Sequence, residues 1–557
     1  MEETIRKYAL ANAYEFGGKA NVKAVVGKIL AEKPELRKNM EEVLSSVGKV
    51  VEEINRMSRE TQKEELEKIF PEHFKKEKRD TKKELPPLPN ISEPVVTRLP
   101  PEPNGYLHIG HGLSFYFNYY YARRYRGRLI LRFEDTNPEK EKLEYFKIIK
   151  EDIQWLKLDW DEERCVSDEL PLLYQYAEKL IEGGHAYVCE CPQEKIKEYR
   201  FKKKGCECRK RTIPENTELW HEMFSSSKNI LRLAGDMESI DVEMRDPTLF
   251  RIIEAPHPIQ KKKYRVWPTY DFECSIEDAV LGITHVLRSN EFHTRLQTYL
   301  RNILGLRHPT IIQYSRLNVR GSPASKRKIK PLIEKGFVSG WDDVRLTTLR
   351  GLKRRGIVPE TIHLLAVEMG LSTSEPKIDW SIIEAINRKI LDPKTKRLFF
   401  VPEPIKLVVE DAPMMKARLD YHPQNDLGMR EIETKGNFYV SRNDFSDKEG
   451  HVVRLKDLYN VKVEKVEDTI HALYHSRELM KTEKFQWVTD DSVSVSVDVV
   501  GPLFIGERYN PESLKSIQGL AEKACEILKE GEVVQFERFG FVRLDDREEM
   551  RFILAHR

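Results

Sequence analysis

Two short motifs, far apart in the chain, carry residue types that bind the phosphates of a nucleotide. The first is a turn rich in glycine and histidine, Gly105-Tyr106-Leu107-His108-Ile109-Gly110-His111, and the second is Ala324-Ser325-Lys326-Arg327. Two histidines separated by Ile-Gly can face the same anion, and glycine lets the backbone approach a nucleotide closely. Lys326 would add mobile positive charge from a separate loop. Together the motifs predict that the chain activates a substrate with ATP.

Each motif alone also has an ordinary explanation. The first could be a surface turn in which one histidine caps a helix, and the second could be a basic surface loop. The turn, however, follows a short apolar run, Pro94 to Leu99, and precedes an aromatic, helix-like run, Leu113 to Tyr121. It is therefore expected between a strand and a helix, where the backbone N–H groups at the helix start favour phosphate.

In this order and context the two motifs resemble the signatures of class I aminoacyl-tRNA synthetases. Four further stretches resemble the glutamyl/glutaminyl branch of that family: Arg98 to Gly105, Leu131 to Pro138, Gly282 to Arg288 and Trp341-Asp342-Asp343. The resemblance implies a two-step reaction, in which an amino acid carboxylate attacks the α-phosphate of ATP and the acyl group then passes to tRNA. This branch is also expected to need bound tRNA before it activates the amino acid.

The resemblance implies roles for individual residues. His108, His111 and Lys326 are expected to be catalytic by stabilising the phosphates, with Mg²⁺ bound to ATP and not held in a protein cage. The expected ATP-binding residues are Pro103, Asn104, Gly105, His108, Gly110, His111, Ser289, Arg316, Leu317, Ala324, Ser325 and Lys326. The residues expected to bind L-glutamate are Arg98, Glu134, Tyr270 and Arg288.

Arg288 decides between glutamate and glutamine. By resemblance, glutamyl enzymes have an arginine at this place, after Thr-His-Val-Leu, whereas glutaminyl enzymes have a small uncharged residue. A guanidinium pairs with a carboxylate through two hydrogen bonds and would leave the NH₂ of glutamine facing a cation. The alternative for Arg288 is a structural ion pair with Glu291 or a phosphate contact. We expect ligation of glutamate to tRNA(Glu) through a glutamyl-adenylate, and we leave open whether tRNA(Gln) is also charged.

Three other functions fit parts of the pattern. A glutaminyl-tRNA synthetase is disfavoured by Arg288, and a non-catalytic, RNA-binding relative of the synthetases is disfavoured by the intact set His108, His111 and Lys326. A small-molecule nucleotidyltransferase would share the His-x-x-His element, but it would not need the long C-terminal region.

Four of the seven cysteines form two Cys-x-Cys pairs, Cys189/Cys191 and Cys206/Cys208, on either side of a segment rich in lysine and arginine. Two such pairs complete a tetrahedral thiolate site that suits zinc, and four protein ligands would make the site structural. The alternative is four reduced surface thiols. Some glutamyl enzymes carry a zinc-binding hairpin in this region, often with a His or Tyr ligand, so an all-cysteine set departs from that pattern.

Length and composition set the frame. A length of 557 residues predicts about three to five domains. The chain is 40% hydrophobic and 33% charged, with a net charge of +3. The chain has no run of about 18 apolar residues, and its N-terminus lacks the apolar core of a signal peptide. We therefore expect a cytoplasmic protein without a membrane partner.

The fold class expected from the pattern and the resemblance is multidomain. It comprises an α/β Rossmann-like class I catalytic domain with an inserted acceptor-stem-binding domain, an N-terminal helical domain, a helical subdomain and C-terminal all-β barrels that bind the anticodon. The catalytic domain is expected at 93–168 and 263–330, and the inserted domain at 169–262. The N-terminal helical domain is expected at 1–90, the helical subdomain at 331–398 and the β-barrels at 399–557.

Finer expectations concern the parts around the catalytic domain. The N-terminal helices resemble the appendage of glutaminyl enzymes and the tail domain of tRNA amidotransferases, which leaves an amidotransferase or other protein contact open for a chain expected to be monomeric. Short apolar runs predict strands near 405–409, 438–440, 452–455 and 493–497. The basic residues of the helical subdomain indicate a surface for the inside of a bent RNA: Arg345, Arg350, Lys353, Arg354 and Arg355.

Overall fold

The computed structural model describes most of the chain. Its described residues are 2–15, 18–33, 36, 39–70, 83–91, 94–225, 228–289, 294–323, 325–374 and 377–557. Ala324, an expected ATP-binding residue, and Glu291, the alternative partner of Arg288, lie outside the described residues. The chain divides into two compact units, Met1–Glu84 and Leu85–Arg557.

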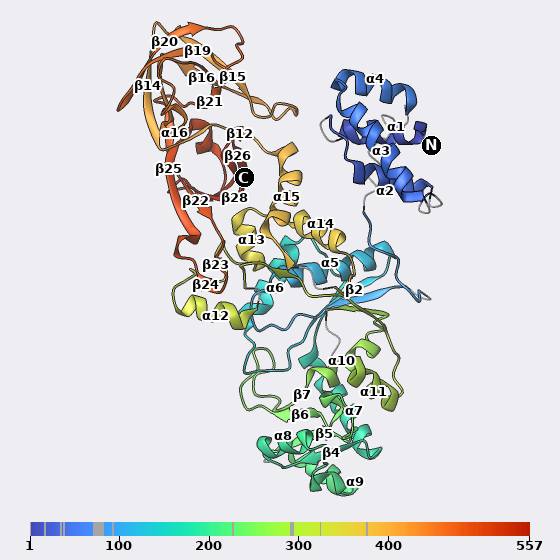
Figure 1. Cartoon of the computed structure of the whole chain (residues 1–557). Helices are drawn as coiled ribbons and strands as arrows, with labels where there is room; N and C mark the ends of the chain where they lie inside the picture. The colour runs from blue at the N-terminus through green and yellow to red at the C-terminus, as the bar shows by residue number, and fades with distance from the viewer. Residues whose placement is uncertain are drawn as a thin grey trace. The chain divides into compact units, whose positions relative to one another are not determined.

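The described residues of the first unit form helices around one apolar core (Figure 1, blue). These helices are α1 (Glu2–Glu15), α2 (Val22–Glu32), α3 (Met40–Asn55) and α4 (Arg59–Ile69). The Asn21 side chain accepts hydrogen bonds from the N–H groups of Lys23 and Ala24 and so caps α2. Val43, Val47 and Ile54 recur at helical spacing on the buried face of α3.

The second unit begins with a parallel sheet. Strands β1 (Val96–Leu99), β2 (Arg128–Phe133) and β3 (Glu162–Cys165) pair in that order, as do β8 (His285–Arg288) and β9 (Thr310–Gln313). The N–H of Thr284 donates to the carbonyl of Val96 (3.0 Å) and joins the start of β8 to β1. The spatial order is therefore β3-β2-β1-β8-β9. The order in which successive strands are added to the sheet reverses between β1 and β8, and open α/β sheets bind their ligands at such a point.

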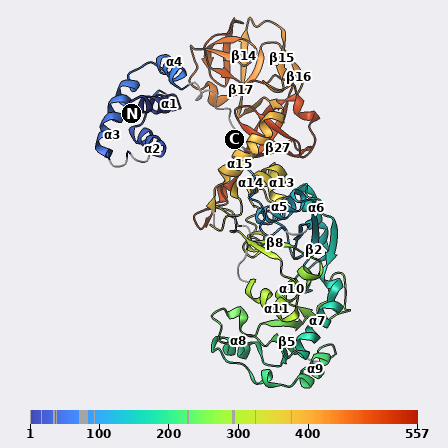
Figure 2. The same ribbon diagram turned by 90° about the vertical axis from the view of Figure 1, so that its right-hand side faces the viewer.

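Helices connect and cover these strands. Helix α5 (Ile109–Arg124) confirms the predicted passage from a strand through the His108 turn into a helix, and α6 (Leu143–Trp155) connects β2 to β3. Farther along the chain lie α12 (Lys326–Glu334), α13 (Leu349–Arg355), α14 (Pro359–Met369) and α15 (Trp380–Leu391), and two short strands, β10 (Asn318–Val319) and β11 (Lys377–Ile378). His363 of α14 stacks on Tyr116 of α5, with ring centroids 4.4 Å apart, and Figure 2 shows these two helices side by side.

A separate antiparallel sheet interrupts the parallel one. It consists of β4 (Ala186–Cys189), β5 (Ile230–Leu233), β6 (Thr248–Ile252) and β7 (Val266–Pro268), together with α7 (Leu170–Glu182), α8 (Gln193–Phe201) and α9 (Ile213–Glu222). The last strand lies past the expected boundary at residue 262, because its three residues pair with β6. The chain then returns to the parallel sheet through α10 (Tyr270–Val280) and later α11 (Thr294–Leu304).

From Arg397 onward the described residues form mainly strands. One seven-stranded sheet has the order β12-β26-β27-β28-β22-β25-β13, and one six-stranded sheet has the order β17-β14-β20-β19-β18-β21. The seven strands are β12 (Arg397–Leu398), β13 (Phe400–Pro402), β22 (Ser492–Val500), β25 (Leu514–Glu522), β26 (Val533–Phe536), β27 (Gly540–Asp546) and β28 (Arg551–His556). The six are β14 (Pro404–Glu410), β17 (Asn437–Ser441), β18 (Val452–Leu455), β19 (Asn460–Val466), β20 (Thr469–Ser476) and β21 (Lys484–Phe485).

Smaller elements complete this region. They are the hairpins β15 (Met415–Asp420) with β16 (Met429–Thr434) and β23 (Phe504–Ile505) with β24 (Arg508–Tyr509), and the short helix α16 (Arg442–Phe445). The four strands predicted from apolar runs are confirmed as β14, β17, β18 and β22. Among the described residues, no helix has the length and apolar character needed to span a bilayer.

Candidate active site

A pocket of about 920 Å³ lies at the carboxyl ends of β1, β2 and β8. Its lining brings together residues that were predicted for two different ligands. From the ATP set it contains Asn104, Gly105, His111, Ser289 and Arg316. From the amino acid set it contains Arg98, Glu134, Tyr270 and Arg288. One cavity therefore holds part of the expected ATP set and all of the expected amino acid set, whereas His108 and Lys326 are not among its lining residues.

The two histidines of the turn are held by their own helix. His108 is the N-cap of α5, and its Nδ1 accepts a hydrogen bond from the N–H of Gly110 (3.1 Å). Nδ1 of His111 accepts one from the N–H of His108 (3.2 Å). In a neutral imidazole the proton is then on Nε2, which is free to donate. The capping role and a phosphate role thus use different nitrogens of the same ring.

Burial keeps both imidazoles neutral. It lowers the pKa of His111 to about 4. Burial, followed by the neighbouring His111, lowers the pKa of His108 well below its ordinary value. The ring centroids are 3.9 Å apart. At neutral pH the pair therefore offers hydrogen-bond donors but not positive charge, and positive charge must come from elsewhere in the site.

Lys326 lies beside the histidine turn. A Cβ added to Gly105 would stand 3.1 Å from Cδ of Lys326, so the glycine leaves room for the lysine stem. Burial, as the largest cause, lowers the pKa of Lys326, while Glu102 acts in the opposite direction. Ser325 directly precedes α12, and Leu317 packs in the hydrophobic core and does not line the pocket. The two sequence motifs thus meet in space.

A buried cluster of charged side chains lies behind the residues that are predicted to bind the substrate amino acid. Asp278 accepts from Arg98 Nε (2.8 Å) and Arg132 Nη1 (2.9 Å) at one oxygen and from Arg301 Nη2 (3.1 Å) at the other. Burial alone would raise the pKa of Asp278, but the three arginines outweigh it and lower the pKa. Nη1 of Arg98 and Oε2 of Glu134 are buried without a hydrogen-bond partner. A free donor and a free acceptor in one wall suit a ligand that carries both charges.

Arg288 is oriented by neutral side chains. Its Nη1 donates to Oε1 of Gln297 and its Nη2 to Oγ1 of Thr294, both at 2.7 Å. Gln297 in turn donates to Oδ1 of Asp271 (3.1 Å). Nε of Arg288 is buried and has no hydrogen-bond partner, and 9% of the residue is exposed. The guanidinium is therefore fixed in direction at the edge of the pocket.

Several lining residues were not predicted from the sequence. They are Glu102, Tyr106, Ser114, Thr136, Asn137, Lys140, Arg251 and Glu273. For Glu273 a signal existed, because it stands three residues after Tyr270 and such residues share one face of a helix. For Arg251 no local signal existed, since it comes from β6 of the antiparallel sheet and reaches the pocket only in the folded chain.

A second set of residues supports the histidine turn from behind. Trp341 stacks on Tyr106 of the turn, with ring centroids 5.3 Å apart and planes 12° apart. The N–H of Ile109 donates to the carbonyl of Thr347 (2.8 Å), and the N–H of Leu349 to that of Leu107 (2.9 Å). The segment that begins with the Trp-Asp-Asp motif therefore pairs directly with the turn.

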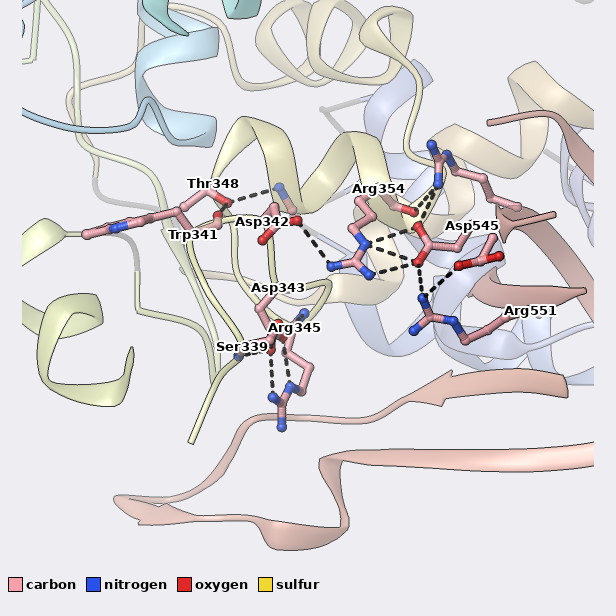
Figure 3. A network of polar contacts seen from close by, with 12 residues as sticks. Ser339, Trp341, Asp342, Asp343, Arg345, Thr348, Arg354, Asp545 and Arg551 are labelled. Atoms are coloured by element: carbon pink, nitrogen blue, oxygen red, sulfur yellow. Dashed lines mark hydrogen bonds and ion pairs between the residues drawn. The ribbon is translucent and has the colours of Figure 1, made fainter. Parts of the chain in front are cut away.

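This supporting segment is anchored to the last sheet (Figure 3). Arg354 donates from Nη1 to Asp342 (3.2 Å) and from Nη2 to Asp545 of β27 (2.8 Å). Arg543 also donates to Asp545 (3.0 Å), and Arg551 lies 3.4 Å from it. Contacts thus run without a break from β27 to the residues that support the histidine turn.

Most basic residues of this segment form ion pairs with other residues of the protein. The expectation that they face RNA is wrong for Arg345 and Arg355, which are both buried. Arg345 pairs with Asp343 (2.7 Å), and Arg355 pairs with Glu384 (2.8 Å) and lies 4.2 Å from the Trp380 ring centroid. A basic run in a sequence does not show partners that only the fold supplies.

The four clustered cysteines converge on one point. Their sulfur atoms all lie within 4.8 Å of one another, with Cys189 to Cys206 at 3.8 Å and Cys191 to Cys208 at 3.9 Å. A tetrahedron of Zn–S bonds of about 2.3 Å places its sulfurs about 3.8 Å apart. None of the four is in a disulfide. The group can hold a metal ion, and its geometry fits the predicted ligand set.

Comparison with known proteins agrees with this fold and site. Residues 94–393 match the model of the tRNA synthetases class I (E and Q), catalytic domain, and residues 395–476 and 484–545 match two anti-codon binding domains of the same group. The chain belongs to the class I tRNA synthetases of the E and Q group.

The chain is also similar over its whole length to proteins named glutamate–tRNA ligase. The chain is 41% identical to the glutamate–tRNA ligase of Pyrococcus furiosus and 41% identical to that of Thermococcus kodakarensis, each over 100% of both chains. It is 40% identical to the glutamate–tRNA ligase of Nitrosopumilus maritimus over 99% of both.

Proposed function

We propose that this chain is a glutamate–tRNA ligase of archaeal type, which joins L-glutamate to tRNA(Glu) with ATP through a glutamyl-adenylate. The observation that carries the proposal is the single pocket that contains both the histidine turn and Arg288. The relatives that match over their whole length carry the same name. A glutaminyl enzyme is the alternative, and Arg288 disfavours it because a cation would face the amide of glutamine.

In the first step the α-carboxylate of glutamate attacks the α-phosphate of ATP and pyrophosphate leaves. Nε2 of His108 and His111 would donate to the phosphate oxygens, and Lys326 would supply the charge that the neutral histidines lack. Mg²⁺ bound to ATP would neutralise further phosphate charge. The other predicted ATP residues that line the pocket, Asn104, Gly105, Ser289 and Arg316, would position the nucleotide.

Glutamate would lie in the other half of the pocket. Arg98 would bind its α-carboxylate, Glu134 its ammonium and Arg288 its side-chain carboxylate, with Tyr270 beside them. In the second step the acyl group passes to a ribose hydroxyl of the terminal adenosine of tRNA. No protein nucleophile is needed, so catalysis rests on positioning and on electrostatic stabilisation.

The tRNA would extend over several parts of the chain. We assign residues 93–168 and 263–330 to a Rossmann-like catalytic domain, 169–262 to the acceptor stem and 399–557 to anticodon-binding barrels. Residues 331–398 would connect the two, and 1–90 would be a helical appendage open to an amidotransferase or other protein contact. Charging of tRNA(Gln) is a further possibility for the same site, because it depends on anticodon contacts and not on the amino acid pocket.

Aminoacylation tests the proposal. The purified chain is given labelled glutamate or glutamine with transcripts of tRNA(Glu) or tRNA(Gln). Glutamate on tRNA(Glu) alone defines a discriminating enzyme, and glutamate on both transcripts defines a non-discriminating one that works upstream of an amidotransferase. Glutamine on tRNA(Gln) would overturn the assignment of Arg288.

We also propose that Cys189, Cys191, Cys206 and Cys208 bind a structural zinc ion. The sulfur spacing supports it, and four protein ligands leave no position for a substrate. Metal analysis of the purified chain should give about one zinc per chain. Cys208→Ser should lower the zinc content and the melting temperature, whereas Cys165→Ser, at an isolated half-buried thiol, should change neither. Equal zinc content in both variants would contradict the proposal.

A further inference from the structure

Glu273 is a buried acid that lines the candidate active site without an assigned role. It lies on α10, one turn after Tyr270, and 1% of the residue is exposed. Its Oε2 is buried and has no hydrogen-bond partner, and the same is true of Oε2 of Glu134, which is 5% exposed. Both residues line the same pocket. Buried carboxyl oxygens need a donor, which can be a proton shared by the two side chains or a ligand that enters the pocket.

Burial without a partner is not sufficient by itself. Glu277, one turn farther along α10, is also 1% exposed and also has a buried oxygen without a hydrogen bond, Oε1. It does not line the pocket. The feature that sets Glu273 apart is therefore its position beside Glu134 at the cavity, and Glu277 is the natural control for it.

Glu134 and two arginines surround Glu273. Oε1 of Glu134 is held by Nε (2.9 Å) and Nη2 (2.8 Å) of Arg132, so Arg132 is directed at Glu134. Burial first, and then the charge and the side-chain hydrogen bond of Glu134, raise the pKa of Glu273 well above its ordinary value, while the hydrogen bond with Thr136 and the charge of Arg132 act in the opposite direction. Arg251 of β6 is the further charged group that interacts with Glu273. A raised pKa favours the protonated form of one of two neighbouring carboxyls, and a ligand cation can take the place of that proton.

We propose that Glu273 is a second positioning residue for the α-ammonium of the amino acid, acting together with Glu134. The ammonium would donate to the free oxygens of both side chains. Its arrival releases the proton of Glu273 to solvent, so that one positive charge replaces another. This inference rests on the proposed function, and it adds to that function a residue by which the site selects an α-amino acid.

The neighbouring arginine favours an ammonium over a metal ion. Nη1 of Arg98 is a buried donor without a partner in the same pocket, and Asp278 joins Arg98 to Arg132 behind Glu134. A ligand with a cation and an anion on adjacent groups satisfies Arg98 and the two glutamates together, and an α-amino acid has that form. Mg²⁺ would need about six oxygens in octahedral array and would face two arginines.

The test compares Glu273→Gln with Glu277→Gln in aminoacylation at saturating tRNA. Glu273→Gln should raise KM for glutamate about 10- to 100-fold, because one charge-assisted contact to the ammonium is lost. KM for ATP should stay within about twofold. The decisive readout is inhibition by glutarate, which is glutamate without its amino group. Its inhibition constant should be the same in Glu273→Gln and in the parent, because glutarate never uses Glu273.

The control outcomes separate this role from a structural one. Glu277→Gln should leave all three constants unchanged. Equal weakening of glutamate and glutarate in Glu273→Gln would mean a general disturbance of the pocket and would overturn the proposal. So would a raised requirement for Mg²⁺ or ATP. Should Glu273→Gln fail to fold, Glu273→Asp, which keeps the charge but withdraws the oxygens, should show the same selective loss for glutamate over glutarate.

Proton release gives a second, independent readout. Calorimetric titration of glutamate into the chain with bound tRNA(Glu), in two buffers of different ionisation enthalpy, should show a proton released by the parent and none by Glu273→Gln. Release that persists in the variant would contradict the exchange. Should the parent charge glutamine instead, the proposed function fails, but Glu273 is still tested with glutamine and its deaminated analogue, because both amino acids carry the same ammonium.

Discussion

Two clusters of arginine and carboxylate in the same compact unit differ in one respect. In the network of Asp343, Arg345, Arg354 and Asp545, every nitrogen and oxygen atom of the four side chains has a hydrogen-bond partner. In the pocket, Arg98, Glu134, Glu273 and Arg288 each keep one buried atom without a hydrogen-bond partner. A satisfied cluster stabilises the fold, whereas an incomplete one is completed by its ligand. Substitutions should therefore cost stability in the network and activity in the pocket.

The largest effect is expected beside the histidine turn, from Lys326→Ala. Under the proposed function Lys326 would supply positive charge to the phosphates beside two neutral histidines, and its loss should lower kcat by about 10²- to 10³-fold, or about 2.7–4 kcal/mol of transition-state stabilisation. The unfolding free energy should hardly change. Aminoacylation rates and urea unfolding measure the two quantities.

Lys330→Ala is the matched control for this change. Lys330 lies on the same helix α12, is exposed, and stands 3.6 Å from Glu334. It should keep the parent rate. A comparable loss of rate in both variants would show that the helix, and not the Lys326 ammonium, matters.

The sequence predicted the residues of the pocket better than the ion pairs of the network. Arg98, Glu134, Tyr270 and Arg288 could be predicted because they belong to short motifs with fixed neighbours, and the pocket contains all four. The partners Arg354 and Asp545 are 191 residues apart. Nothing near either residue indicates the other, so Arg354 was predicted to face RNA. Local spacing reveals residues of one turn or strand, but not an ion pair that two distant segments complete.

The next effect concerns amino acid selection. Replacing Arg288 by alanine should raise KM for glutamate and reduce the preference for glutamate over glutamine by about 10²-fold or more, because the proposed bidentate pair with the side-chain carboxylate would be lost. Arg288→Lys should recover only part of the preference, since an ammonium lacks the planar fork. The ratio of kcat/KM for the two amino acids is the measurement. An unchanged ratio in Arg288→Ala would leave only a structural role for Arg288.

A smaller effect is expected in the network, and it should appear in stability. Asp545→Asn would leave Arg354, Arg543 and Arg551 facing a neutral amide, at a cost of about 1–3 kcal/mol in unfolding free energy. Its kcat/KM at low temperature should remain close to that of the parent. Asp342→Asn, at the exposed end of the same network, should cost about 0.5 kcal/mol or less. Urea unfolding of both variants makes the comparison, and the reverse order would contradict it.

The smallest effect is expected in the pH dependence of stability, which should have opposite signs for Asp545 and Glu273. Burial would raise the pKa of Asp545, but the Arg354 hydrogen bond and the charges of Arg354, Arg543 and Arg551 outweigh it and lower the pKa. Its contribution is thus present above the unfolded-state pKa, about 3.9, and is lost as the pH falls through the lower folded value. Asp545→Asn should therefore lose less stability than the parent on acidification.

Glu273 should behave in the opposite way, because its folded pKa is raised. Above the unfolded-state pKa of about 4.3 the folded chain holds the extra proton, so rising pH lowers stability until the folded pKa is passed. Glu273→Gln removes that dependence, and the variant should be at least as stable as the parent at pH 8. Melting curves between about pH 5 and pH 8 should thus show the parent losing more stability than Glu273→Gln. A variant that is less stable across this range would mean that Glu273 belongs with the satisfied structural pairs and not with the groups kept free for the substrate.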